Sequence, residues 1–155
     1  MLRLSRLFAL LLLGLTLGCT SPALTPIPGP IPPPPPGAAQ IILYRQIGYY
    51  EASDVLRVAL NQLPAGTLPR GDVLYRNVAP GTYTVTFSPT RPDPYQFKTV
   101  TLGPGQVAYV KIAALPVRPC TRFGLAGCDI NGYSAMIMPP PAAQQELQGL
   151  TLIAG

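Results

Sequence analysis

Strict alternation of apolar and polar residues is clearest over residues 82–88. There Tyr83, Val85 and Phe87 alternate with three threonines and a serine. A period of two sustained over seven residues indicates a half-buried antiparallel strand. Shorter β-rich runs predict further strands at residues 40–45, 55–60, 73–78, 96–102, 106–112 and 133–138.

The same alternation predicts which side chains enter the core. In residues 106–112, Tyr109 and Lys111 are expected to face out, away from the core, and Arg57 takes the same position in residues 55–60. The core is then built from the apolar side chains on the inward faces of these strands: Leu56, Val58, Leu60, Leu74, Val85, Phe87, Val100, Leu102, Val110 and Ile112.

The spacing of the predicted strands indicates an all-β fold, because turns recur between short runs and only residues 142–150 have a helix-like composition. We predict a single Ig-like antiparallel β-sandwich of about seven strands over residues 39–117. A C-terminal extension, residues 118–155, is expected to hold a disulfide loop, the last strand and a short helix.

Three different short motifs follow one another along these strands. Tyr44-Arg45 closes the first, Pro80-Gly81-Thr82-Tyr83 opens another, and Gly105-Gln106 begins a strand that reaches Tyr109-Val110. This order resembles prealbumin-like sandwiches, which include carboxypeptidase-regulatory-like, Cna-B-type and PEGA-type modules. It is similar above all to small bacterial envelope lipoproteins with an uncharacterised domain of this kind. The resemblance covers residues 40–113 and implies a fold, not a function.

The Pro80-Gly81 pair has a physical interpretation of its own. Pro80 pre-sets φ for a turn, and we expect Gly81 to adopt a positive φ there. Tyr83 is expected to point inward and to be largely buried, with its hydroxyl bonded to backbone near the turn, as in a tyrosine corner. The alternative is a plain hairpin with Tyr83 on the surface. Both interpretations are structural, and neither makes Tyr83 a catalyst.

The N-terminus is typical of an exported protein. Two arginines precede an apolar run over residues 7–17, which is about half the length that a membrane-spanning helix needs. Leu17-Gly18-Cys19 resembles a bacterial lipobox, so we expect residues 1–18 to be a signal peptide and Cys19 to be lipidated. In such lipoproteins an Asp directly after the lipidated cysteine retains the protein at the inner membrane. This chain has Thr20 there, so where that rule applies the resemblance implies delivery to the outer membrane, facing the periplasm. The alternative is an ordinary secretory signal with an incidental cysteine.

A proline-rich linker follows over residues 19–38. Nine of the 21 prolines of the chain lie between residues 21 and 37, so this stretch is expected to be extended polyproline II. We interpret it as a spacer between the lipid anchor and the folded domain. The alternative is a ligand for a proline-recognising groove.

Two further cysteines, Cys120 and Cys128, form an even pair once Cys19 is lipidated. Two glycines between them allow the chain to fold back, so an oxidising compartment favours a disulfide. Two free thiols are the alternative. A metal site is not expected, because two thiols without histidine cannot complete a tetrahedral shell.

Composition limits the chemistry that the chain can perform. Only 11% of residues are charged, histidine is absent, and Asp and Glu total 6, which removes histidine-dependent triads and leaves few acid–base groups. We therefore expect no enzyme activity and no cofactor. The basic residues are scattered over the chain, so we expect a solvated, mildly basic surface and no nucleic-acid partner.

The candidate binding surface is the loop that contains Tyr49, Tyr50 and Glu51. Adjacent tyrosines suit contact with a protein or a glycan; alternatively, one folds onto the core and the other caps an edge strand. We expect a non-catalytic, lipid-anchored cell-envelope protein that acts by protein binding or scaffolding. The alternative is a carbohydrate- or peptidoglycan-binding module at the outer membrane.

Overall fold

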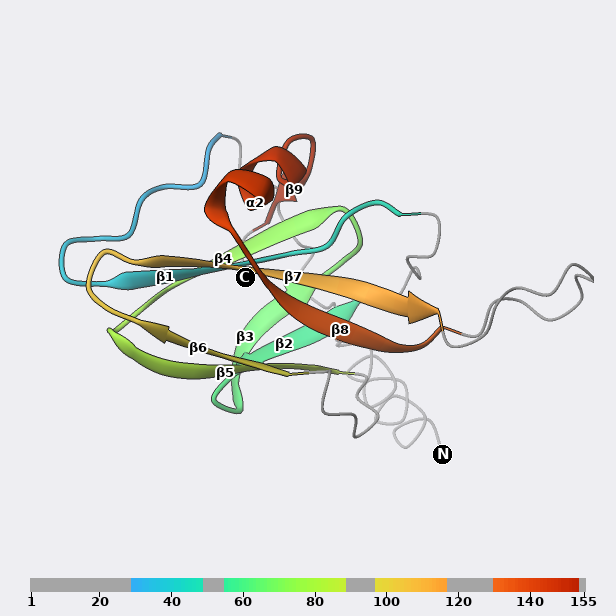
Figure 1. Ribbon diagram of the computed structural model, residues 1–155, viewed down its shortest axis with the longest axis horizontal. Helices are drawn as coiled ribbons and strands as arrows, with labels where there is room; N and C mark the ends of the chain where they lie inside the picture. The colour runs from blue at the N-terminus through green and yellow to red at the C-terminus, as the bar shows by residue number, and fades with distance from the viewer. Residues whose placement is uncertain (1–28, 49–54, 89–96, 117–129, 154–155) are drawn as a thin grey trace, which may run out of the picture.

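The computed structural model describes residues 29–48, 55–88, 97–116 and 130–153. These residues form a β-sandwich with one short helix (Figure 1). The elements, in chain order, are β1 (Ala39–Tyr44), β2 (Leu56–Leu60), β3 (Leu63–Leu68), β4 (Asp72–Val78), β5 (Gly81–Ser88), β6 (Lys98–Leu102), β7 (Val107–Pro116), β8 (Ile130–Met138), α2 (Pro140–Glu146) and β9 (Thr151–Leu152).

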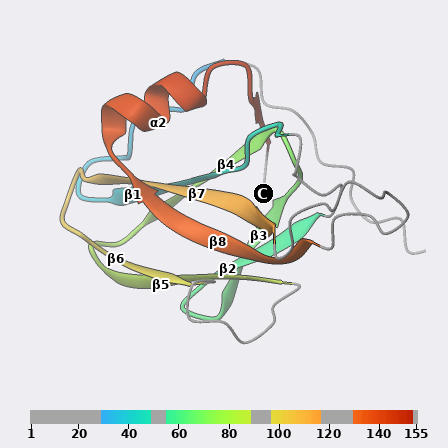
Figure 2. The same cartoon turned by 45° about the vertical axis from the view of Figure 1, so that its right-hand side comes forward.

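The strands make two sheets that lie face to face (Figure 2). One has five strands in the order β8-β7-β1-β4-β9, and the other has four in the order β3-β2-β5-β6. The four-stranded sheet is antiparallel throughout, whereas β1 pairs with β7, and β4 with β9, in parallel. The predicted all-β sandwich is confirmed, and the described residues contain nine strands where about seven were expected.

Two strands were not predicted, and both have local reasons. β3 contains Pro64 and Gly66, which interrupt the apolar pattern, and its pairing with β2 carries a register shift. Asn61 and Gln62 connect these two strands with φ values of 50° and 68°, the left-handed conformation of a tight hairpin turn. β9 is only two residues long and exists through its pairing with β4.

The core lies between the two sheets, and every side chain that the alternation assigned to it is buried. The C-terminal segment belongs to the same structure, since β8 pairs with β7 along its whole length and β9 pairs with β4. One basic residue is also inside. Arg45 is 0% exposed; it donates to the carbonyl of Leu68 at 3.2 Å, and its guanidinium carbon lies 5.1 Å from the ring centre of Tyr133. The expectation of a solvated side chain is therefore wrong for Arg45.

The Pro80-Gly81 pair lies where the chain crosses from β4 in one sheet to β5 in the other. The predicted positive φ at Gly81 is wrong: the residue is already part of β5, outside the left-handed region. A crossover between sheets needs no hairpin reversal, so no left-handed residue is required. The Tyr83 hydroxyl donates to the carbonyl of Ala79 at 2.7 Å, as expected for a tyrosine corner. Tyr83 itself is partly rather than largely buried.

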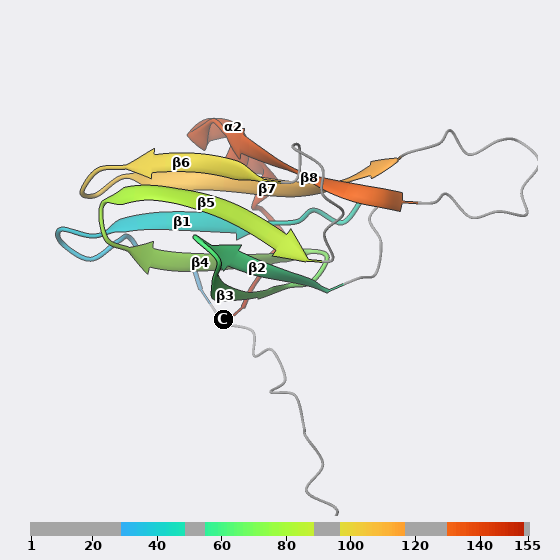
Figure 3. The same cartoon turned by 90° about the horizontal axis from the view of Figure 1, so that it is seen from below.

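The two outer faces of the sandwich differ. Seen from below, the four-stranded sheet has no described element lying over it (Figure 3). Its outward side chains include threonines that pair across β5 and β6, with Oγ1 atoms 3.0 Å apart in Thr82–Thr101 and 3.4 Å apart in Thr84–Thr99. The five-stranded sheet is covered instead: α2 lies over its outer face in both Figures 1 and 2. All six residues of β1 are buried: Ala39, Ile41 and Leu43 lie in the core between the sheets, and Ile42 and Tyr44 lie on the covered outer face.

Candidate binding groove on the outer sheet face

The outer face of the five-stranded sheet carries a second apolar cluster. Ile42 and Tyr44 of β1, Val73 of β4 and Leu152 of β9 pack there with Ala143 of α2. Tyr109 joins them from β7 and is only partly exposed. Tyr109 and Lys111 thus face away from the inter-sheet core, as the alternation predicts, but they are not open to solvent because a helix and a proline-rich segment lie over this face.

That proline-rich segment is residues 29–36, which we call the proline strap. Ile31 of the strap packs against the outer apolar cluster. Gln40 of β1, which is 2% exposed, donates from Nε2 to the carbonyl oxygen of Pro32 at 2.9 Å. The same Nε2 donates to Oδ1 of Asn77 at 3.0 Å, which fixes the orientation of the amide. From Gly29 onward, the linker lies on the sheet rather than standing away from it.

The strap joins β1 through an ordered turn. Gly37 has a φ of 79°, and the amide of Ala38 donates to the carbonyl of Pro35 at 3.0 Å. The carbonyl of Ala38 in turn accepts from the amide of Gly105 at 2.7 Å. This turn reverses the chain, so the strap runs back over the sheet of which β1 is part.

Helix α2 is held on the sheet by a polar clamp, which we define as Tyr44, Lys111, Glu146 and Gln46. Lys111 Nζ lies 2.8 Å from Glu146 Oε1 and donates to Gln46 Oε1 at 2.7 Å. The Tyr44 hydroxyl donates to the other Glu146 oxygen at 2.7 Å. Both carboxylate oxygens of Glu146 thus accept hydrogen bonds from the sheet.

The clamp changes the titration of its members. Burial works to raise the pKa of Glu146, but the hydrogen bonds from Lys111 and Tyr44, together with the Lys111 charge, outweigh it and hold the pKa below its usual value. Burial, and then the bond to Glu146, raises the pKa of Tyr44 well above its usual value. The carboxylate and the neutral phenol are therefore the stable forms at neutral pH.

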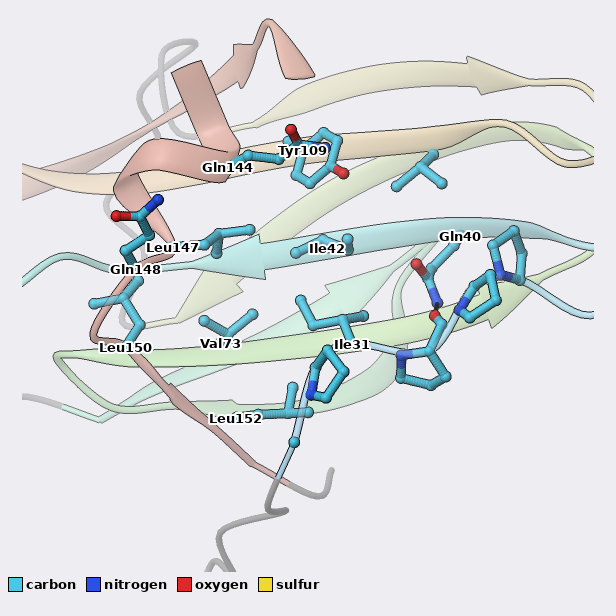
Figure 4. A pocket seen from close by; sticks show the side chains of 16 residues that line it. Ile31, Gln40, Ile42, Val73, Tyr109, Gln144, Leu147, Gln148, Leu150 and Leu152 are labelled. Atoms are coloured by element: carbon cyan, nitrogen blue, oxygen red, sulfur yellow. Dashed lines mark hydrogen bonds between the residues drawn. The ribbon is translucent and has the colours of Figure 1, made fainter. Parts of the chain in front are cut away.

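Between the strap, the sheet and α2 lies a groove of about 580 Å³ (Figure 4). Ile42 and Val73 form its floor, Ile31 and the strap prolines form one wall, and Tyr109 lies opposite. Leu147, Gln148 and Leu150 close the end beneath α2. None of the residues that line the groove carries a charge.

This geometry suits binding rather than catalysis. The volume lies within the range of roughly 300–1,000 Å³ that is usual for ligand sites, which are mostly apolar with a few polar groups. The polar groups here are the amides of Gln40, Gln144 and Gln148 and the hydroxyl of Tyr109. Among the described residues, no three His, Cys, Asp or Glu side chains gather as a metal site would require.

Most of the sequence-predicted sites lie outside the described residues. This applies to the lipidation site Cys19, the disulfide pair Cys120 and Cys128, and the candidate surface Tyr49, Tyr50 and Glu51, and all of these stay predictions. Within the described parts of the chain, no helix has both the length and the apolarity to cross a membrane.

The sequence pattern does not predict this groove, although two signals of it are present. Residues 41–44 are apolar at every position, not at every second one, and this is typical of a strand that is covered on both faces. Ile31 is a second signal, since a solvated spacer has no need of an isoleucine among its prolines.

Comparison with known proteins adds no further identification. No protein-family description, curated protein or solved structure matches this chain. The prealbumin-like resemblance therefore stays a prediction, and the site has to be interpreted from its own geometry.

Proposed function

We propose that this chain is a non-catalytic, lipid-anchored protein of the bacterial cell envelope that acts by binding or scaffolding another protein. The observation that carries the proposal is the groove between the proline strap, the five-stranded sheet and α2. This groove combines an uncharged apolar floor with amide groups at the rim.

The apolar floor supports a protein partner over a glycan. Ile42, Val73 and Leu152 offer aliphatic surface, which an apolar side chain or an extended segment buries favourably. Sugars present hydroxyls that need many hydrogen-bonding partners, and they stack on aromatic rings. Tyr109 is the sole aromatic residue among those that line the groove, so the groove gives the carbohydrate-binding alternative no support.

The lipid anchor supports a function at a membrane surface. Two or three acyl chains on Cys19 would hold the protein at a bilayer without a spanning helix. Residues 20–28 would then be the link between the anchor and the strap, and nine extended residues reach about 30 Å. With the strap docked, the groove would then lie close to the membrane, and the location that we propose is the outer membrane, facing the periplasm.

The anchor is tested by Cys19→Ser. We expect the variant to lose incorporation of labelled fatty acid and to leave the membrane fraction, or to accumulate as the unprocessed precursor. Unchanged labelling and fractionation would overturn the lipoprotein assignment. Separately, alkylation of Cys120 and Cys128 as free thiols in the mature protein would overturn the predicted disulfide.

Partner binding is tested by photo-crosslinking in cells. A photoreactive amino acid placed at Gln144, which lines the groove, is expected to crosslink to one protein, with the attached peptide identified by mass spectrometry. The matched control is Gln145, a neighbour of the same residue type that is exposed and does not line the groove. No protein adduct at position 144, or the same adducts at both positions, would overturn protein binding through the groove.

A further inference from the structure

The proline strap shows how the outer sheet face holds a proline-rich segment. A polyproline II segment makes no internal hydrogen bonds, and proline lacks an N–H group, so its carbonyls need donors from elsewhere. Gln40 supplies such a donor to Pro32 at 2.9 Å, and Asn77 holds the amide in position. Ile31 meanwhile buries its side chain against the apolar cluster.

The open part of the groove, alongside the strap, offers the same combination of amide donors and apolar surface. Gln144 of α2, Gln148 in the turn after it and Tyr109 of β7 all line the groove. None of these three side chains makes a hydrogen bond to another residue that the structure describes. In Figure 4, Gln144 and Tyr109 lie side by side above the apolar floor, and Gln148 lies at one end.

The occupant that fits this set of groups is an uncharged segment with free carbonyls. The absence of charged lining residues disfavours an acidic or basic peptide. A bare hydrocarbon chain would fill the apolar floor but would make no use of the donors of Gln144 and Gln148 at the rim. A proline-rich segment covers the apolar floor with its rings and offers carbonyls to the donors at the rim. Because it is already extended in solution, it loses little conformational entropy on binding.

We propose that the groove recognises a proline-rich, polyproline II segment of a partner protein, which lies beside the chain's own proline strap. This inference rests on the proposed function, since it names the partner chemistry of the same groove. Gln144 and Gln148 donate to carbonyls of the incoming segment as Gln40 does to Pro32, and Ile42 and Val73 receive its ring and aliphatic surfaces.

The probe is a fluorescently labelled decaproline peptide, titrated against the lipidated protein in nanodiscs and followed by fluorescence anisotropy. We expect saturable binding, and no binding of a glycine–serine peptide of the same length. Replacing both Gln144 and Gln148 by Ala is expected to weaken binding about fivefold or more, since each loses a hydrogen bond to the peptide. Gln145→Ala is the matched control and is expected to bind like the unaltered protein.

Several results would overturn the inference. These are the absence of saturation, equal binding of the glycine–serine peptide, equal weakening by Gln145→Ala, or displacement of the peptide by laurate at low concentration, which would indicate a site for acyl chains. A partner peptide crosslinked at position 144 but lacking prolines would refute this inference and leave the proposed function standing. Failure to crosslink any protein there would refute the proposed function itself.

Discussion

The side-chain amide of Gln40 donates a 2.9 Å hydrogen bond to the carbonyl oxygen of Pro32, eight residues earlier in the chain. This contact joins a central strand of the five-stranded sheet to a segment that composition alone assigns to a spacer. It also explains why a glutamine that is 2% exposed is tolerated in β1: both of its amide hydrogens have acceptors, in Pro32 and Asn77.

Gln40→Leu tests this contact directly. The substitution puts an apolar side chain of similar size in place of the amide and removes both hydrogen bonds. The strap therefore loses its polar attachment to β1. We expect the free energy of unfolding to fall by about 1–3 kcal/mol, with a drop of several degrees in melting temperature. Gln145→Leu, an exposed change in α2, is the control and is expected to leave the melting temperature unchanged. Equal melting temperatures for both variants would mean that the strap does not depend on Gln40.

Two glycines are expected to respond oppositely to alanine. Gly71 has a φ of 84°, and an added Cβ would lie 2.8 Å from Cγ1 of Ile47. Ile47 is exposed and can move, so the cost of Gly71→Ala comes mainly from the backbone and is about 1–2 kcal/mol. At Gly81 the added Cβ would lie 3.8 Å from Tyr83 Cε2, an ordinary contact.

Gly81→Ala is therefore expected to be neutral or to stabilise by about 0.5 kcal/mol, as replacement of glycine in a strand generally does. Urea unfolding of the two variants measures the difference. A loss of stability in Gly81→Ala as large as that in Gly71→Ala would instead support the positive φ that the sequence predicts for Gly81.

Tyr83 is expected to stabilise the crossover between the sheets through its hydroxyl and its ring. Tyr83→Phe removes the 2.7 Å bond to Ala79 and is expected to cost about 1 kcal/mol. Tyr83→Ala also removes a partly buried ring and is expected to cost about 2–4 kcal/mol. Tyr49→Ala, in the predicted surface loop, serves as the comparison and is expected to change stability by less than about 0.5 kcal/mol. Similar losses in thermal melts of Tyr83→Ala and Tyr49→Ala would contradict this assignment.

How far the fold follows from the sequence depends on the strand. The existence and orientation of β5 are predictable because one of its faces packs inward and the other faces solvent. The alternation of Tyr83, Val85 and Phe87 with polar residues therefore follows its burial. β1 is buried on both faces, and alternation carries no information there. β3 contains a proline and a glycine at an edge, where pairing with β2 outweighs poor local propensity.

The groove was harder to predict, since its parts come from distant segments. Ile31, Tyr109 and Gln144 meet only after the chain has formed both sheets and placed α2. The outward position of Tyr109 follows from alternation, but its covering does not, because the cover is formed by a proline segment and a seven-residue helix. Contacts of this kind are tertiary and leave no period in the sequence.

The polar clamp predicts how stability depends on pH. The pKa of Glu146 is lower in the folded chain than in the unfolded chain, so its contribution is complete above the unfolded value of about 4.3 and is lost as the pH falls through the folded value. The pKa of Tyr44 is raised, so its contribution is complete below about pH 10 and is lost as the pH rises beyond that value. Stability is therefore expected to be flat across neutral pH.

Glu146→Gln isolates the acidic limb of this profile. Burial raises the pKa of Asp72, so protonation of Asp72 favours the folded state as the pH falls. This effect is common to the unaltered chain and the variant. The quantity to measure is therefore the difference between their free energies of unfolding. We expect Glu146→Gln to be less stable at pH 7 and the difference to shrink below pH 4. A difference that does not change between pH 7 and pH 3 would show that the Glu146 charge does not hold α2.

On the proposed function, a partner binds on the outer face of the five-stranded sheet and not on the opposite, threonine-bearing face. The most direct measurement moves the photoreactive amino acid to Gln148, which also lines the groove. It then compares Gln144→Trp, which fills the groove, with Thr101→Trp on the outer face of β6, by the yield of crosslinked partner in cells at equal protein levels. We predict that Gln144→Trp lowers the yield about tenfold, as expected when an interface centre is blocked, and that Thr101→Trp leaves it unchanged. Loss of the partner in Thr101→Trp, with full yield in Gln144→Trp, would contradict the account.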